Sequence, residues 1–243
     1  MLSGALIKTS LIDYPGKVAC AWFLTGCSLR CPYCYNADSV FNRLKAEESV
    51  TETQVFEHLT KRRNVLSGFV ISGGEPLIHA EIPALIQKVK KLGYAVKLDT
   101  NGMHPQELER LCAKDDTCPD FIAIDLKTSA DRYNLLVPQH SPLYTNKTNP
   151  ASHRLLQSID IACRFFSCEN REFRTVLVPP LVQKDDITDM AALLPQDARW
   201  RFAPFLPENC LDPSYNDIIP YSGEQMNTLV SHARTLIKDS MLR

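Results

Sequence analysis

The sequence predicts an α/β fold, a partial (β/α)6 barrel of parallel strands similar to part of a TIM barrel. Six short apolar runs alternate with segments whose apolar residues recur at helical spacing. Parallel strands need crossover connections, and helices supply them. Six strand–helix units are fewer than the eight that close a full barrel, so we expect a partial one. Repeats, low-complexity tracts and linkers are absent from the sequence, which predicts a single domain over residues 1–243.

Each expected strand is a short apolar run, and the first, over residues 18–24, has the composition of a buried strand. The other strands are expected at residues 68–72, 95–99, 121–126, 173–178 and 199–204. In such folds, functional groups collect at the carboxyl ends of the strands. The residues that follow each strand are therefore the candidates for a functional site.

The expected helices lie between these strands. Thr51 and Gln54 form a capping-box pattern that opens a helix to about Arg63. Apolar residues recur at helical spacing over residues 82–92, and Gly93 is placed to stop that helix. Further helices are expected from about residue 105, over 152–166, over 187–194 and over 226–237.

The composition excludes several classes of protein. Lys and Arg number 27 against 28 Asp and Glu, a net charge of −1, so no basic field attracts nucleic acid. The longest apolar run, 18–26, falls short of the roughly 20 residues of a membrane helix, and no signal peptide is expected. Nine cysteines cannot all pair, and without export they favour reduced thiols in the cytoplasm over a disulfide framework.

Three of the cysteines follow the first expected strand with ligand-like spacing. Cys27, Cys31 and Cys34 place three thiolates on one short loop. A four-iron cluster ordinarily takes four cysteines, so three leave one iron open to bind a substrate or cofactor. Zinc with a fourth ligand from elsewhere is the competing metal. The spacing favours iron–sulfur and leaves zinc open, whereas three unrelated buried cysteines are a poor explanation.

Polar groups and glycines follow the next strands. Gly73 and Gly74, followed by Glu75, allow a close backbone approach to a ligand, although a plain glycine turn explains the pair equally well. Asp99 and Asp125 end successive strands after apolar runs, where a carboxylate must be paired, solvated or coordinating. Two interpretations of these carboxylates remain open: a helix cap or salt bridge, or a site for a ligand or cation.

Two basic residues lie at the same strand ends. Lys127 follows Asp125 and is its candidate salt-bridge partner. Arg174 lies between apolar residues of the fifth strand and requires an anion, either a structural Asp or the carboxylate of a cofactor.

The two motifs together resemble those of the radical S-adenosylmethionine (SAM) enzymes. The spacing Cys27-x3-Cys31-x2-Cys34 with Tyr33 before the last cysteine is similar to their cluster motif, and residues 73–76 to their methionine-binding motif. The resemblance implies the radical SAM fold, a partial barrel of six strands, with a [4Fe-4S] cluster on the three cysteines and SAM on its fourth iron. This pairing of motifs argues against zinc.

Longer segments resemble glycyl-radical-enzyme activases. These are residues 13–16, 33–36, 98–102 and 124–127, while the opening residues 8–17 are most similar to the longer anaerobic ribonucleoside-triphosphate reductase activating proteins. The resemblance implies an oxidoreductase that generates a 5′-deoxyadenosyl radical and installs a glycyl radical on a partner enzyme. Anaerobic ribonucleotide reductase is the expected partner, with flavodoxin or ferredoxin as electron donor.

The resemblance also implies roles for individual residues. The backbone of Tyr33 would meet the adenine, and the backbone of residues 73–75 would orient the SAM amino group. In pyruvate formate-lyase activase, residues matching Asp99, Thr100 and Asp125 hold a monovalent cation beside the SAM carboxylate, which Lys127 and Arg174 would also steady.

The chain departs from the activase pattern at two positions. Tyr35 stands where the activase motif usually has His before its Asn, and Leu206 stands where pyruvate formate-lyase activase has a His after the last strand. The second difference disfavours pyruvate formate-lyase as the partner. Two other functions stay open: a radical SAM enzyme acting on a small molecule, similar to 7-carboxy-7-deazaguanine synthase, and a non-catalytic metal-binding protein. Cys210 is the additional cysteine expected nearest the site, and loop 129–150 is expected to be a lid or partner-docking surface.

Overall fold

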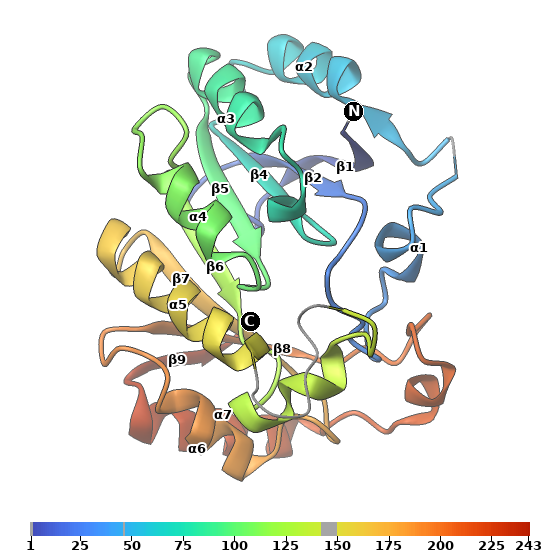
Figure 1. Cartoon of the computed structure of the whole chain (residues 1–243), viewed down its shortest axis with the longest axis vertical. Helices are drawn as coiled ribbons and strands as arrows, with labels where there is room; N and C mark the ends of the chain where they lie inside the picture. The colour runs from blue at the N-terminus through green and yellow to red at the C-terminus, as the bar shows by residue number, and fades with distance from the viewer. Residues whose placement is uncertain (1, 46, 142–149) are drawn as a thin grey trace. The chain divides into compact units, whose positions relative to one another are not determined.

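The computed structural model of the chain describes residues 2–45, 47–141 and 150–243 (Figure 1). The chain divides into two compact units that are interleaved along the sequence. Unit 1 comprises Met1–Ser28, Asp38–Thr100 and Gln106–Ile122, and unit 2 comprises Leu29–Ala37, Asn101–Pro105 and Ala123–Arg243. Both units alternate strands with helices, as the sequence predicts.

Unit 1 is built on strands in the order β3-β1-β2-β4-β5. Its parallel strands are β2 (Ala19–Leu24), β4 (Gly68–Gly73) and β5 (Ala95–Thr100). At the edge, β1 (Ser3–Ser10) pairs antiparallel with β2 and with the short β3 (Val50–Thr51). The chain enters β6 (Phe121–Asp125) beside β5, since the backbone N–H of Asp120 donates to the carbonyl of Val96 at 2.7 Å.

The helices of unit 1 connect these strands. They are α1 (Ala37–Val40), α2 (Glu52–Lys61), the 3₁₀ turn η1 (Pro76–Ile78), α3 (Ile82–Lys91) and α4 (Pro105–Cys112). The capping box of Thr51 and Gln54 is present at the start of α2, which confirms that prediction. Gly93 has a φ of 90°, a left-handed conformation that ends the helical path after α3.

Unit 2 is built on the end of β6 and on three parallel strands. These are β7 (Arg171–Leu177), β8 (Arg199–Pro204) and β9 (Asp239–Leu242). The N–H of Leu126 donates to the carbonyl of Arg174 at 2.8 Å, so the end of β6 lies beside β7. The helices are η2 (Ala130–Leu136), α5 (Pro150–Phe165), α6 (Lys184–Ala191), η3 (Pro213–Asp217) and α7 (Gly223–Leu236), and α6 packs against α7.

The six predicted strands correspond to β2, β4, β5, β6, β7 and β8. The sequence does not predict β1, β3 or β9, and α2 ends at Lys61 rather than at about Arg63. Residues 130–136, within the predicted 129–150 loop, form η2 instead of an irregular loop, and Tyr133 and Leu136 of η2 are buried. Residues 142–149 of the same loop lie outside the described residues.

Each unit has its own apolar core around its strands. In unit 1, Trp22, Phe69 and Ile71 are fully buried. In unit 2, Trp200 and Phe202 stack with ring centroids 4.6 Å apart. Strands buried on both faces read as near-continuous apolar runs, which explains why these strands are predictable. No helix in the described part of the chain has the length and apolar character needed to cross a membrane.

Candidate active site

In unit 1, the end of β4 lies directly against the end of β2. The N–H of Gly74 donates to the carbonyl of Leu24, and that of Glu75 to the carbonyl of Gly26, both at 2.8 Å. A Cβ on Gly74 would overlap the Gly26 carbonyl and lie 3.3 Å from the Cβ of Cys27. Gly74, predicted to allow close approach to a ligand, therefore already allows close approach to the segment that carries Cys27.

The side chain of Glu75 links the ends of β4 and β5. It is fully buried, and its Oε1 accepts from the N–H of Leu77 at 3.0 Å and from the hydroxyl of Thr100 at 2.8 Å. A buried carboxylate is tolerated only when hydrogen bonds satisfy it. Glu75 and Thr100, both predicted site residues, thus contact one another within unit 1.

Asp99 is paired with a residue that the sequence analysis did not single out. The Nζ of Lys97 lies 2.6 Å from Oδ1 of Asp99, and the Lys97 side chain is 0% exposed. Residues two apart on a strand share a face, so the pair was detectable from spacing alone once both were placed on β5. The carboxylate at this strand end is therefore neutralised by the same strand.

In unit 2, the loop after Ser28 is held by backbone hydrogen bonds to residues 211–212 and within the loop itself. The carbonyls of Pro32 and Cys34 accept from the N–H groups of Asp212 and Leu211, each at 2.9 Å. The N–H of Cys34 also donates to the carbonyl of Cys31 at 3.0 Å, which closes a turn. These bonds fix the backbone between two of the three motif cysteines.

Tyr33 is buried within this loop. Its ring meets that of Phe205 edge to face, with centroids 6.5 Å apart. Burial raises the pKa of its phenol well above the usual value, although the nearby Lys127 opposes the shift. Among the described residues its buried hydroxyl has no hydrogen-bond partner. Buried polar atoms are usually satisfied, so this hydroxyl is available to a bound ligand or water.

Asp125, Lys127 and Arg174 form one charged cluster in unit 2. Nε of Arg174 lies 2.8 Å from Oδ1 of Asp125, and Nζ of Lys127 lies 3.3 Å from Oδ2. Burial alone would raise the pKa of Asp125, but the two cations lower it to about 2. Asp125 raises the pKa of Lys127 against the opposing effect of burial, and the Cys31 thiol and the Tyr33 phenol act in the same direction.

The three motif cysteines belong to both units: Cys27 to unit 1, and Cys31 and Cys34 to unit 2. None of these three described cysteines is part of a disulfide, and Cys31 is buried. The described residues contain no group of three or more His, Cys, Asp or Glu side chains arranged to hold a single metal ion. In an iron–sulfur cluster each thiolate binds a different iron, so a cluster does not need three sulfurs on one ion.

Cysteines outside the motif have different surroundings. Cys210 is buried, and its pKa is raised by burial and then by its electrostatic interaction with the nearby Cys34. Cys112 and Cys118 share a hydrogen bond that raises the pKa of Cys112 and lowers that of Cys118. The two departures from the activase pattern, Tyr35 and Leu206, are 60% and 59% exposed.

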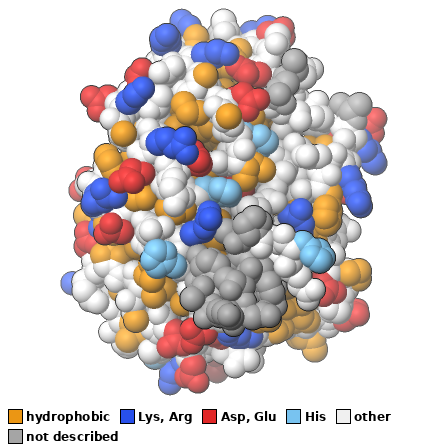
Figure 2. Space-filling view, in the orientation of Figure 1, with side chains coloured by type: hydrophobic (Ala, Val, Ile, Leu, Met, Phe, Trp, Pro, Cys, Tyr) orange, Lys and Arg blue, Asp and Glu red, His pale blue; other side chains and the backbone are white. Residues whose placement is uncertain are grey.

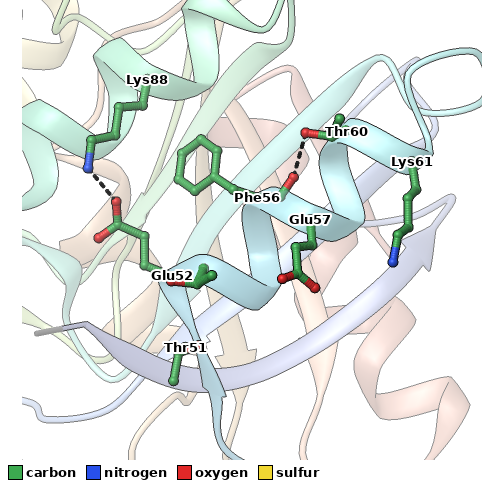
Figure 3. Close-up of a pocket in the computed structure, with 8 residues that line it drawn as sticks. Thr51, Glu52, Phe56, Glu57, Thr60, Lys61 and Lys88 are labelled. Atoms are coloured by element: carbon green, nitrogen blue, oxygen red, sulfur yellow. Dashed lines mark hydrogen bonds and ion pairs between the residues drawn. The ribbon is translucent and has the colours of Figure 1, made fainter.

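A hollow of about 750 Å³ lies in unit 1, lined by residues of β3 and α2 and by Lys88 of α3. Figure 3 shows the ion pair between Lys88 and Glu52, 2.7 Å apart, on its rim. None of the predicted site residues lines this hollow. Acidic and basic side chains are interspersed over the face shown in Figure 2.

The residues of each unit, taken separately, suit the cofactors that the motifs imply. Thiols spaced as Cys27, Cys31 and Cys34 suit an iron–sulfur cluster, the backbone at Gly74 has no room for a side chain, and the Tyr33 hydroxyl lacks a partner among the described residues. The charged cluster around Arg174 and Lys127 carries two cations for one carboxylate, which suits an anionic group of a ligand.

Comparison with known sequences gives consistent matches. The chain matches the radical SAM superfamily over residues 23–191. It is 27% identical over 246 residues to a protein of Methanocaldococcus jannaschii named as a glycyl-radical enzyme activating enzyme, which covers 100% of this chain and 95% of that protein. It is 28% identical over 183 residues to the pyruvate formate-lyase-activating enzyme of Streptococcus mutans, covering 72% of this chain and 64% of that enzyme.

Comparison with solved structures supports the fold. QueE from Escherichia coli superposes with a TM-score of 0.54 at 14% identity, covering 99% of this chain and 92% of that one. Native anSMEcpe with bound AdoMet gives a TM-score of 0.57 at 15% identity, covering 90% of this chain and 62% of that one. These likenesses confirm the predicted fold class, an α/β fold of parallel strands.

Proposed function

Because the chain belongs to the radical SAM superfamily, we propose that it is a glycyl-radical-enzyme activase. The observation that carries this proposal is the match to a named activating enzyme along the whole of both chains. A second match, to a pyruvate formate-lyase-activating enzyme, covers 72% of this chain. The superfamily match runs through both units, which supports their acting together as one radical SAM domain over residues 1–243.

The cofactors of this superfamily are a [4Fe-4S] cluster and SAM. We propose that Cys27, Cys31 and Cys34 hold the cluster. When bound, the cluster and SAM together supply the radical that removes a hydrogen atom from a glycine Cα of the partner. One electron from flavodoxin or ferredoxin is required for each such event.

The residues of the chain bind and orient SAM in this proposal. Gly73 and Gly74 expose backbone groups to the amino group, and Arg174 and Lys127 bind the carboxylate. The loop fixed by Pro32 and Cys34 presents the backbone of Tyr33 to the adenine. Preorganisation of these groups excludes water and keeps the reacting atoms in place.

The proposed partner is an anaerobic ribonucleoside-triphosphate reductase. The opening residues 8–17 support this choice, as does Leu206 at a position where pyruvate formate-lyase activase has His. In unit 2, Leu206 is largely exposed, as is Tyr35. An exposed apolar residue suits a protein surface better than a small charged substrate.

The test is activation of the partner. The chain is reconstituted with iron and sulfide without oxygen, reduced, and mixed with SAM and the reductase. We expect a glycyl-radical doublet in the EPR spectrum and formation of 5′-deoxyadenosine. A Cys31→Ala variant loses both, whereas Cys168→Ala, outside the motif, keeps them. 5′-Deoxyadenosine without a doublet would contradict this partner, and no 5′-deoxyadenosine at all would contradict the activity.

A second candidate function has one observation in its favour. The chain is 33% identical over 89 residues to the 7-carboxy-7-deazaguanine synthase of Aquifex aeolicus, which covers 36% of this chain and 38% of that enzyme. Those enzymes act on a small molecule, but their cysteine spacing differs from the one in this chain. This alternative would be supported if the reconstituted chain consumed a small-molecule substrate and yielded no protein radical.

A further inference from the structure

The activase resemblance implies a monovalent cation at Asp99, Thr100 and Asp125, but these residues do not fit a bound cation in this chain. Each of the two carboxylates already has a side-chain cation within its own unit. We propose that this enzyme dispenses with the monovalent cation and that Lys97 serves as the built-in counter-charge of Asp99. This inference rests on the proposed function, since it concerns the SAM site of an activase.

The position of Lys97 carries the inference. Its side chain is 0% exposed, and its Nζ lies 2.6 Å from Oδ1 of Asp99 and 5.8 Å from the ring centroid of Phe121. An ammonium group away from water must be paired, and here the partner is the carboxylate that a metal cation would need. A potassium or sodium ion at Oδ1 of Asp99 would meet a fixed positive charge at hydrogen-bond distance.

Thr100 is also engaged elsewhere. Adjacent residues of a strand point to opposite faces, so the side chains of Asp99 and Thr100 leave β5 in opposite directions. The Thr100 hydroxyl donates to the buried Oε1 of Glu75 at 2.8 Å. The two side chains therefore do not form a chelating pair on one face of unit 1.

The second carboxylate is neutralised independently in unit 2. Asp125 has the Arg174 guanidinium at 2.8 Å and the Lys127 ammonium at 3.3 Å. Two cations flank this one carboxylate, and their field opposes the approach of a further cation. Neither carboxylate offers the unpaired negative charge that binds a hydrated monovalent cation.

The first experiment uses the unmodified chain. SAM binding to the reconstituted enzyme is measured by equilibrium dialysis in potassium chloride and in tetramethylammonium chloride at equal ionic strength, so that screening is constant. We expect the dissociation constant to differ by less than about twofold, because no site for the ion is coupled to SAM. About tenfold tighter binding in potassium would overturn the inference.

The second experiment converts the site. Lys97→Met keeps most of the side-chain volume but removes the ammonium beside Asp99, so it makes room for a small cation at this carboxylate. In the cluster-free full chain, we expect this variant to gain thermal stability in potassium relative to tetramethylammonium, whereas the unmodified chain shows no difference. The double variant Lys97→Met/Asp99→Asn has no carboxylate at this position to bind a cation, so we expect no gain in thermal stability in potassium.

The outcomes separate the inference from the proposed function. A potassium response that is equal in all three proteins, or confined to the unmodified chain, contradicts the role of Lys97. If Lys97→Met does not fold in tetramethylammonium but folds in potassium, the inference holds. If it folds in neither salt, the dialysis result on the unmodified chain decides. Absence of 5′-deoxyadenosine in every salt contradicts the activase instead, while the melting curves still report on Lys97.

Discussion

Gly74 matters because it has no side chain, which lets two strand ends touch. The carbonyl of Gly26 lies where a Cβ of residue 74 would be, and the next residue along that strand end is Cys27. The glycine motif thus sets the position of a motif cysteine before any ligand binds. Backbone close approach of this kind has no tolerance for even one methyl group.

Gly74→Ala is predicted to destabilise the chain by about 2–4 kcal/mol, since the new Cβ forces the β4 and β2 ends apart. Urea unfolding of the cluster-free chain measures the change. Gly223→Ala is the matched control: a Cβ there meets nothing within 4 Å, and the helix α7 should gain up to about 1 kcal/mol. Equal stability of the two variants would contradict the close-approach argument.

Asp125 gives a pH dependence with a defined sign. Its folded-state pKa is lowered to about 2, below the unfolded value of about 3.9. The contribution of the ion pair is therefore present above about pH 4 and is lost as pH falls through about 2. The carboxylate is 29% exposed, so solvent screening reduces its effect to about 1 kcal/mol.

The measurement is the 13C titration of the Asp125 carboxyl in the cluster-free chain, with urea unfolding of Asp125→Asn as a second readout. We expect the carboxyl to stay ionised down to pH 3, and the stability difference between the unmodified chain and the variant to shrink below pH 4. Asp160→Asn, at an exposed pair with Arg164, should change stability little at any pH. A midpoint near 4 for Asp125 would contradict the pairing.

At the scale of elements, the sequence predicts what depends on local pattern. The capping box at Thr51 and the stop at Gly93 depend on neighbours three or four residues away, and both are present. The sequence does not predict β3 and β9, which are short strands at the two ends of the strand order, or β1, which pairs with β3 only at Ser3 and Gly4. Half-exposed residues give these strands no continuous apolar run, and β1 contains Gly4, whose missing side chain allows contact with Phe23.

The contacts of the site residues were harder to predict for a related reason. The sequence shows that Glu75 and Thr100 end their strands, but the hydrogen bond between them depends on the register of two parallel strands. Likewise, the sequence offered Lys127 and not Lys97 as a partner for a strand-end carboxylate. Lys97 and Asp99 both lie in the expected strand 95–99, so the spacing of two residues already predicts that they share a face.

The Glu75–Thr100 contact is predicted to join the two strand ends of unit 1. Thr100→Val keeps the shape but removes the hydroxyl that donates to a fully buried carboxylate, so we expect a loss of about 1.5–3 kcal/mol in unfolding free energy. Thr60→Val on the exposed face of α2, whose hydroxyl bonds only its own helix, should change stability by less than about 0.5 kcal/mol. Similar losses for both variants would show that the contact is dispensable.

At the scale of the whole molecule, nine cysteines are spread over both units, and their surroundings separate them. Cys20 and Cys112 are buried in unit 1, and burial raises the pKa of Cys20 to about 12. A thiol that resists deprotonation is a poor iron ligand. Only the motif cysteines combine ligand spacing with a loop fixed by backbone hydrogen bonds, while Cys210 lies near Cys34 without belonging to the motif.

The iron content of the whole chain tests this separation. Anaerobic reconstitution of the unmodified chain is predicted to give about four irons and four sulfides per chain, because one cubane is expected. Cys210→Ala should keep that content, since the three motif thiolates suffice, whereas Cys34→Ala should lose most of it. Iron and sulfide assays with Mössbauer spectroscopy measure both quantities. About eight irons in the unmodified chain, or loss of the cluster in Cys210→Ala, would mean that cysteines outside the motif bind iron, and the assignment of Cys27, Cys31 and Cys34 as the complete ligand set would be wrong.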